Sequence, residues 1–369
     1  MKAVVWQGVG DIALNDVPDP RIQKPTDAII RTTTTAICGT DLHMVRGTLP
    51  GMRPGQILGH EAVGEVVEVG SEVRNFSPGD RVVVGSSIAC GYCSYCRAGY
   101  ESQCDNANPG GPRAGVAFYG GPESAGGYPG LQAQYARIPY ASANLVSLPD
   151  DLGDDTAILL SDIFPTAWYG TELAEIRPGD TVAVFGAGPV GQLVVLSARM
   201  RGAGRVIAVD HVEDRLAFAK RMHAETVNFD AEDPVAAINE LTGGIGVDRA
   251  VDAVGIDATG PAGRDGDGAQ AARWAVQALA KAGTLGVIGV YPTTMETFPL
   301  GLAMNKNLTV KAGNCNHRRY IPELIAVARN ASVGPAVVLT DTVPFDLVID
   351  AYQHFDRREP GWIKVALHQ

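Results

Sequence analysis

A glycine-rich turn at residues 186–191 constrains the fold of this 369-residue chain more than any other feature. The apolar run before it, residues 181–185, is typical of a buried parallel strand, and the pattern after it predicts a helix to about Arg201. A strand, a tight turn and a helix in this order open a βα unit, whose turn can hold a pyrophosphate against the helix N-terminus. The candidate cofactor-binding residues of the turn are Gly186, Gly188, Pro189, Val190 and Gly191.

The acidic residue Asp210 indicates which dinucleotide the turn binds. It ends the next predicted strand, residues 205–209, some twenty positions beyond the turn. A carboxylate there can accept hydrogen bonds from the adenosine ribose and would repel a 2′-phosphate, so NAD is favoured over NADP. The nearest downstream cation, Arg215, falls inside a predicted helix and is badly placed to hold a phosphate.

Alternating strands and helices continue to about residue 313 and predict a doubly wound Rossmann domain over residues 164–313, within an α/β fold. An irregular insert at 256–268 interrupts the pattern. The last predicted strand, near 308–311, could pair with a second copy because exposed strand edges invite pairing. We therefore expect a homo-oligomer, either a dimer or a tetramer.

The rest of the chain predicts a β-rich catalytic domain over 1–163 and 314–369. Short β-branched runs are separated by Gly, Pro and Asp turns, and residues 361–366 resemble a closing strand of the same domain. Lys364 lies in that strand. It either faces a cofactor phosphate or is a solvated charge at the sheet edge.

Four cysteines predict a closed metal site in a lobe at residues 90–104: Cys90, Cys93, Cys96 and Cys104. Four thiolates can surround one zinc ion without any other protein ligand, which makes such a site structural. An iron–sulfur cluster is the alternative, but the spacing is not that of a ferredoxin. The chain begins without the apolar core of a signal peptide, which disfavours disulfides, and we expect a cytoplasmic protein.

A second metal site is indicated by Cys38 and the Gly59-His60-Glu61 segment, because cysteine and histidine are preferred zinc ligands. Cys38 alone would be a core residue. Asp41 and Glu61 either support the ligands as nearby carboxylates or play ordinary surface and turn roles. Asp162 is either a helix cap, close to Ser161 and Pro165, or the third ligand. We favour the ligand.

Thr40 and His43 are candidates for a proton relay. A zinc-bound alcohol must lose its proton before hydride leaves, and a hydroxyl passed on to an imidazole can carry that proton to water. Without the metal ligands, His43 would be interpreted as a solvent-facing helix residue. The loop at 105–130, with Phe118 at its centre, is expected to border the substrate site.

The formal charge of −11 excludes a general attraction to nucleic acid, and the longest weakly charged run, residues 181–198, is broken by glycines and a proline. We expect neither a nucleic-acid partner nor a membrane span. The partner that remains is a small alcohol or aldehyde.

In these motifs the whole chain resembles the zinc-dependent medium-chain alcohol dehydrogenase family, and within it the glutathione-independent formaldehyde dehydrogenase branch. The resemblance implies a GroES-like domain, a catalytic zinc on Cys38, His60 and Asp162 with Glu61 nearby, and the Thr40–His43 relay. It also implies the structural zinc and an NAD-type Asp210. Many members carry cysteine where Asp162 stands.

The function expected is therefore hydride transfer between an alcohol and NAD through a zinc-bound alkoxide, or the reverse reduction of an aldehyde or ketone. A glutathione-independent formaldehyde dehydrogenase or dismutase is the closest alternative. A metal-free quinone or enoyl reductase would leave Cys38, His60 and Asp162 unused, and a non-catalytic NAD-binding protein would leave Thr40 and His43 unused.

Overall fold

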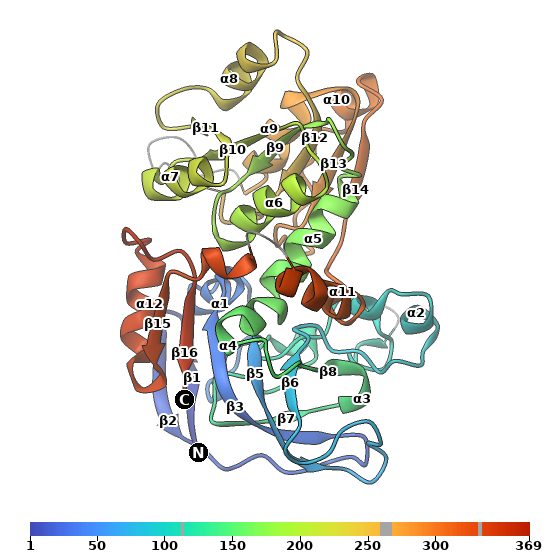
Figure 1. Cartoon of the computed structure of the whole chain (residues 1–369), viewed down its shortest axis with the longest axis vertical. Coiled ribbons are helices and arrows are strands. Elements are labelled where there is room, and N and C mark those ends of the chain that lie inside the picture. Colours follow the sequence, from blue (N-terminus) through green and yellow to red (C-terminus); the bar gives the residue numbers. More distant parts are fainter. Residues whose placement is uncertain (112–113, 259–267, 331–333) are drawn as a thin grey trace. The chain divides into compact units, whose positions relative to one another are not determined.

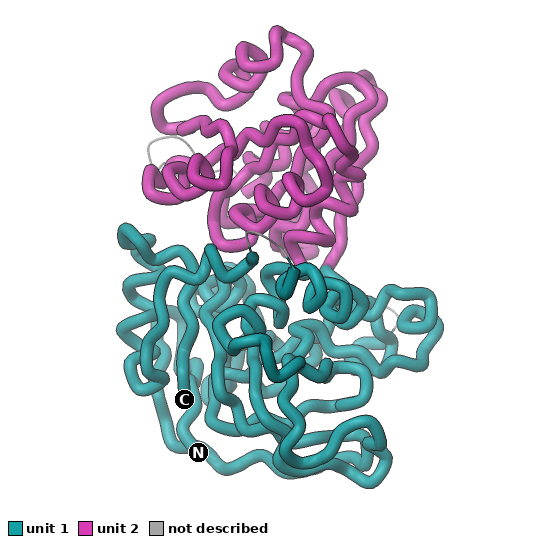
Figure 2. Tube along the Cα trace, in the orientation of Figure 1, with its two compact units in different colours: residues 1–165, 315–369 teal, residues 166–314 magenta. Residues whose placement is uncertain are grey.

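The computed structural model describes residues 1–111, 114–258, 268–330 and 334–369. The chain divides into two compact units (Figure 2). Unit 1 comprises Met1–Pro165 and Cys315–Gln369, so both ends of the chain build it, and unit 2 is Thr166–Asn314. The described residues include no helix that is long and apolar enough to cross a membrane.

Unit 1 is built on two sheets, and Figure 1 labels their strands apart from β4. One has the order β2-β1-β4, and the other has the order β15-β16-β3-β5-β6-β8, with β7 also paired to β3. The strands are β1 (Lys2–Gly8), β2 (Asp11–Asp16), β3 (Ala28–Ile37), β4 (Gln56–Ile57), β5 (Ala62–Val69), β6 (Arg81–Val84), β7 (Tyr135–Ile138), β8 (Leu145–Ser147), β15 (Asp341–Pro344) and β16 (Val365–His368).

The C-terminal strand β16 lies antiparallel to β3, with Val365 opposite Ile37. The closing strand expected near residue 361 therefore exists but begins later, after Gly361, whose φ of 87° favours glycine. This register places Lys364 next to the end of β3, where Cys38 follows.

Helices of unit 1 are short, apart from those near the C-terminus. The α-helices are α1 (Gly39–Val45), α2 (Ser94–Arg97), α3 (Ala141–Asn144), α4 (Asp154–Ala157), α11 (His317–Asn330) and α12 (Val348–Asp356). The 3-10 turns are η1 (Glu101–Gln103), η3 (Glu123–Ala125), η4 (Ile158–Leu160), η6 (Pro335–Val338) and η7 (Phe345–Leu347). α12 packs into an apolar core with β1 and β16, through Tyr352 and Phe355.

Unit 2 is a six-stranded parallel sheet in the order β11-β10-β9-β12-β13-β14. Its strands are β9 (Thr181–Phe185), β10 (Arg205–Asp210), β11 (Glu225–Asn228), β12 (Val247–Asp252), β13 (Leu279–Val287) and β14 (Thr309–Ala312). Its helices are α6 (Pro189–Met200), α7 (Glu213–Arg221), α8 (Pro234–Leu241), α9 (Gln270–Ala278) and α10 (Leu300–Asn305), and α5 (Ile163–Leu173) leads into it.

This sheet confirms the doubly wound Rossmann architecture, and unit 1 supplies the β-rich partner domain. The strand order reverses between β9 and β12, and ligands of such sheets bind at this reversal, beyond the strand ends. The glycine turn follows β9 at that point. Most of the predicted insert, residues 259–267, lies outside the described residues.

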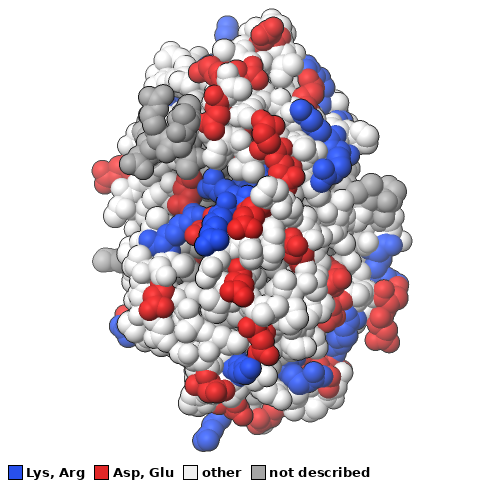
Figure 3. Space-filling view, turned by 90° about the vertical axis from the view of Figure 1, so that its left-hand side faces the viewer, with Lys and Arg blue, Asp and Glu red and all other residues white. Residues whose placement is uncertain are grey.

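Acidic and basic side chains are interspersed on the face shown in Figure 3. With a formal charge of −11, an anionic cofactor needs a local binding feature rather than a general positive field.

Candidate metal centres and dinucleotide turn

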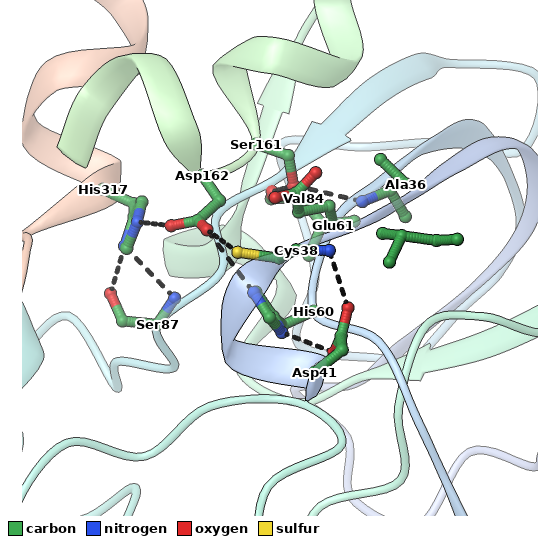
Figure 4. Close-up of polar contacts among 12 residues, drawn as sticks. Ala36, Cys38, Asp41, His60, Glu61, Val84, Ser87, Ser161, Asp162 and His317 are labelled. Atoms are coloured by element: carbon green, nitrogen blue, oxygen red, sulfur yellow. Dashed lines mark hydrogen bonds and ion pairs between the residues drawn. The ribbon is translucent and has the colours of Figure 1, made fainter. Parts of the chain in front are cut away.

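Four side chains that could hold one metal ion converge inside unit 1: Cys38, His60, Glu61 and Asp162. Their ligand atoms lie within 4.8 Å of one another, and all four residues are buried (Figure 4). Cys38 follows β3, His60 and Glu61 precede β5, and Asp162 precedes α5. The structure therefore brings together the three ligands expected from the sequence, together with Glu61.

The distances between these atoms fit a zinc ion. Oδ2 of Asp162 lies 3.4 Å from Sγ of Cys38 and 3.4 Å from Nε2 of His60. Zinc bonds of about 2.0 Å to nitrogen or oxygen and about 2.3 Å to sulfur place neighbouring tetrahedral ligands about 3.3–3.5 Å apart. A set of one thiol, one imidazole and one carboxylate is also a donor set that zinc accepts.

Asp41 supports the other side of His60. Its Oδ1 lies 3.2 Å from Nδ1 of His60, although the alignment falls short of a hydrogen bond. Its Oδ2 accepts a hydrogen bond from the backbone N–H of Cys38 at 3.0 Å and from the Gln132 amide at 3.3 Å. A carboxylate beside the distal nitrogen favours the tautomer in which Nε2 is available to a metal.

Asp162 is directed into this cluster. Its Oδ1 lies 2.7 Å from Nε2 of His317, which the sequence analysis did not identify. The neighbouring Ser161 donates to the carbonyl of Val84 at 2.5 Å and accepts from the N–H of Ala62 at 3.1 Å. Ser161 therefore joins the start of α5 to the sheet of unit 1, which fixes the direction of the next side chain.

Burial and neighbouring charges shift the pKa values of this cluster. Burial raises the pKa of Cys38 to about 11, and the Asp162 charge adds to the effect. Burial alone would lower the pKa of His60, but Asp41 and Cys38 more than offset it and raise that pKa well above its usual value. Burial likewise opposes ionisation of Asp162, but hydrogen bonds from His317 and His60 hold its pKa well below the usual value.

The side chain of Lys364 lies in neither of the two positions expected from the sequence. Its ammonium is fully buried and donates to both carboxylate oxygens of Glu61, at 2.7 and 2.5 Å, and to the carbonyl of Ile37 at 2.9 Å. Three acceptors occupy its three donors, so it does not face a cofactor phosphate. This corrects both sequence-based interpretations. Burial raises the pKa of Glu61 to about 7, although Lys364 opposes the shift.

The two relay candidates lie on α1, three positions apart and so on one side of the helix. Thr40 is half-buried, and His43 is buried, with only 6% of its surface exposed. His43 Nδ1 lies 3.2 Å from Oγ1 of Thr48. A solvent-facing position for His43 is thus excluded, while the relay itself stays a prediction.

The four cysteines of the lobe also form a compact cluster. Sγ of Cys90 lies 4.0 Å from that of Cys96, and Sγ of Cys93 lies 3.9 Å from that of Cys104. A tetrahedral ion with zinc–sulfur bonds of about 2.3 Å requires about 3.8 Å. Cys90 also accepts hydrogen bonds from the N–H groups of residues 92 and 93 and from Asn106, as a thiolate ligand would.

The three glycines of the turn in unit 2 differ in what an added side chain would contact. Gly186 has φ of 91°, and a Cβ there would lie 2.5 Å from Val254. A Cβ at Gly191 would overlap the carbonyl oxygen of Gly186, so this glycine lets α6 pack against the turn. At Gly188, the nearest atom to an added Cβ is 3.7 Å away, on Arg215. An added Cβ at Gly188 would make only an ordinary contact, so packing within the protein does not explain this glycine.

Asp210 ends β10 and shapes the same turn. Its Oδ2 accepts from the N–H of Ala187 at 2.7 Å, and its Oδ1 accepts from those of His211 and Val212 at 2.7 and 3.0 Å. Gln192, buried in α6, donates to the carbonyls of Ala187 and Arg215 at 2.8 Å each. The turn thus uses three of the about four acceptor sites of the Asp210 carboxylate, and one site on Oδ2 remains.

Phe118 of the 105–130 loop lies against the metal cluster. Its ring meets the His60 ring edge-on, with centroids 6.0 Å apart. Gly120, with φ of 68°, packs on the backbone of Gly59, so the loop is fitted closely to the segment that carries His60. An aromatic wall beside His60 is consistent with the expected position of the loop.

Sequence reasoning missed four residues that hold the sites, namely Ser87, Gln132, Gln192 and His317. None of them lies in a recognisable motif. Three of them contact partners more than 90 positions away in the sequence. Ser87 and His317 are 230 positions apart, His317 and Asp162 are 155 apart, and Gln132 and Asp41 are 91 apart. Only Gln192, which follows the glycine turn directly, was close to a known signal.

Residues 24–150 match the family described as alcohol dehydrogenase GroES-like domain, and residues 189–330 match the family described as zinc-binding dehydrogenase. Together with the two metal clusters, these matches define the class. The chain belongs to the zinc-dependent medium-chain alcohol dehydrogenase family and is a zinc-type alcohol dehydrogenase-like oxidoreductase.

Individual relatives agree with this assignment. The zinc-type alcohol dehydrogenase-like protein AdhB of Bacillus subtilis (strain 168) is 38% identical over 100% of both chains. The glutathione-independent formaldehyde dehydrogenase of Pseudomonas aeruginosa is 39% identical over 79% of this chain and 75% of its own. The solved alcohol dehydrogenase TADH from Thermus sp. ATN1 is 34% identical, with a TM-score of 0.87 over 100% of this chain and 99% of its own.

Proposed function

We propose that this protein catalyses NAD-dependent oxidation of a small alcohol, or the reverse reduction of an aldehyde or ketone, at a zinc site formed by Cys38, His60 and Asp162. One observation carries the proposal: a thiol, an imidazole and a carboxylate converge on one buried point, with spacings that suit a zinc ion. When bound, zinc would act as a Lewis acid on the substrate oxygen, and NAD would exchange the hydride.

The residues of unit 1 have distinct tasks in this reaction. Cys38, His60 and Asp162 hold the cation, and Asp41 orients His60. Glu61 stays close enough to join the ligand set, while Lys364 balances its charge. Thr40 receives the proton of the substrate hydroxyl and passes it to His43. Phe118 shields one side of His60 from water.

The glycine turn and Asp210 would hold the dinucleotide in unit 2. The N-terminus of α6 suits a pyrophosphate, and Gly188 has no close contact that would keep one out. The Asp210 carboxylate would accept from the ribose hydroxyls and repel a 2′-phosphate. Asp210→Ser is therefore expected to narrow the preference for NAD over NADP at least tenfold, as measured by the dissociation constants of the two cofactors.

Oxidation of formaldehyde is a second candidate activity. The observation that favours it is the 38–39% identity to proteins named glutathione-independent formaldehyde dehydrogenase. The same ligand set would serve, because hydrated formaldehyde presents a hydroxyl like that of an alcohol. The two activities differ in the size of the substrate.

The edge strand β14 supports self-association. All four of its residues are exposed, and nearby apolar side chains are exposed as well: Leu300 by 71%, Met304 by 71% and Val310 by 40%. Pairing of two such edges would cover them, which gives a dimer or a tetramer. Light scattering on Val310→Lys protein, which should dissociate, tests this.

Metal analysis and initial rates test the function together. The proposal predicts about two zinc ions per chain, and NAD-linked turnover with at least one member of a panel of primary, secondary and aromatic alcohols and formaldehyde. Asp162→Asn protein should keep the zinc of the cysteine lobe and lose turnover. A wild-type protein with one zinc per chain and no turnover across the panel would overturn the proposal.

A further inference from the structure

His317 is the first residue of α11 and reaches the metal cluster from the C-terminal part of unit 1 (Figure 4). Its ring is 6% exposed, and its two nitrogens meet different groups. Nε2 lies 2.7 Å from Oδ1 of Asp162. Nδ1 lies 2.9 Å from Oγ of Ser87 and 3.3 Å from the backbone nitrogen of Ser87. The ring therefore bridges Asp162 to the segment that follows β6.

The contact with Asp162 determines what Nε2 does. A carboxylate can only accept, so Nε2 of His317 carries a hydrogen and donates to Oδ1 of Asp162. On the other side of the ring, the backbone N–H of Ser87 points at Nδ1. Oγ of Ser87 contacts both Nδ1, at 2.9 Å, and the carbonyl oxygen of Cys315, at 3.2 Å. The donation to Asp162 is the same for either orientation of the Ser87 hydroxyl.

Because of this contact, the two carboxylate oxygens of Asp162 have different partners. Oδ1 is held by His317, while Oδ2 faces Cys38 and His60 at 3.4 Å from each. A carboxylate free to rotate could offer either oxygen, or both, to a cation. Here Oδ2 is the oxygen turned toward the other two ligands.

We propose that His317 is a positioning residue of the metal site, which holds Asp162 so that the carboxylate binds zinc through Oδ2 alone. This inference rests on the proposed function, because it requires zinc at the site. Outer hydrogen-bond partners of metal ligands typically change metal affinity by about 10- to 100-fold when they are removed. We expect an effect of that size at this site and none at the cysteine lobe.

Two amide substitutions separate positioning from mere packing. In His317→Gln, the side-chain N–H₂ can reach the position of Nε2 and still donate to Asp162. In His317→Asn, the shorter amide reaches only the position of Nδ1, so the donor to Asp162 is lost. Both are polar and smaller than histidine, which makes them a matched pair. Ser87→Ala serves as a control, because it leaves the contact between Nε2 of His317 and Asp162 in place.

The measurement is the zinc dissociation constant of the catalytic site, obtained by chelator competition on the full chain, together with the visible spectrum of cobalt-substituted protein. His317→Asn should weaken zinc binding about 10- to 100-fold and change the cobalt d–d bands, with the second zinc retained. His317→Gln and Ser87→Ala should stay within a few-fold of the wild type.

The inference fails if His317→Asn binds zinc as tightly as the wild type with an unchanged cobalt spectrum. It also fails if His317→Gln and His317→Asn lose affinity equally, because packing alone would then explain the loss. If the wild type itself binds only one zinc per chain, the proposed function fails along with it. Turnover does not enter any of these readouts.

Discussion

The Lys364 ammonium donates to both carboxylate oxygens of Glu61 across 303 positions of sequence, in a pair with no exposed surface on either side chain. The strand register of β16 on β3 brings the two residues together. Burial opposes the charge of each side chain, and each favours the charged form of the other.

Removal of Lys364 tests that pair. Lys364→Met should destabilise the protein by about 3–5 kcal/mol, because it leaves the Glu61 carboxylate buried without its cation. The pKa of Glu61, now about 7, should rise further. Urea unfolding measures the loss. The double variant Glu61→Gln, Lys364→Met should be more stable than Lys364→Met alone; additive losses would argue against the pairing.

The cysteine lobe should depend on its metal for folding. Cys93→Ser removes one sulfur of the cluster, in which Cys93 lies 3.9 Å from Cys104. Structural zinc contributes about 10–16 kcal/mol, against a typical domain stability of about 5–15 kcal/mol. We expect loss of one zinc per chain and a large drop in the melting temperature, measured by elemental analysis and calorimetry.

Cys315→Ser is the matched control for this experiment. Cys315 is also a buried cysteine outside any disulfide, but it is not among the four residues of the cluster. Its replacement should leave the zinc content unchanged. Equal zinc loss in the two variants would refute a specific role for the lobe.

Alanine substitutions at two glycines of the dinucleotide turn should have different effects, one on stability and the other on NAD affinity. Gly191→Ala places a methyl group on the carbonyl oxygen of Gly186, so it should destabilise unit 2. Gly188→Ala makes only an ordinary van der Waals contact, with Arg215 at 3.7 Å, at a φ of −69° that alanine adopts readily, so the protein should fold. It should still lose NAD affinity, because the methyl group occupies the space of the pyrophosphate. Calorimetric melting and NAD titration distinguish the two; normal NAD binding by Gly188→Ala would exclude the proposed cradle.

Asp154 should make stability depend on pH in the acid range. Burial opposes its ionisation, but hydrogen bonds from Thr33 at 2.6 Å and from Arg81 at 3.2 Å lower its pKa below 3.8. A lowered pKa in the folded state means that its contribution is complete above the unfolded value and is lost as the pH falls through 3.8 toward the folded value.

Asp154→Asn should therefore cost about 2 kcal/mol at pH 7, and the difference from the wild type should shrink as the pH falls toward 3. Urea unfolding of both proteins at pH 7, 5, 4 and 3 measures this difference. A penalty that stays constant over that range would show that the charge of Asp154 does not contribute.

The sequence by itself determined the parts of this protein whose chemistry is local. The four cysteines lie within fifteen positions, and the glycine turn lies between a strand and a helix that are also its neighbours in the chain. Local spacing was enough to predict these two sites, because the same few residues determine the backbone conformation and supply the binding groups.

Only the tertiary structure decided how the residues of the buried metal cluster are held. His317, Tyr352 and Lys364, all from the C-terminal part of unit 1, reach Asp162, Gln132 and Glu61 respectively. No sequence spacing predicts such contacts, because they depend on strand register and helix packing between distant segments. A lysine in a terminal strand could equally have faced solvent. Burial of Lys364 beside a second buried charge is a property of the folded core alone.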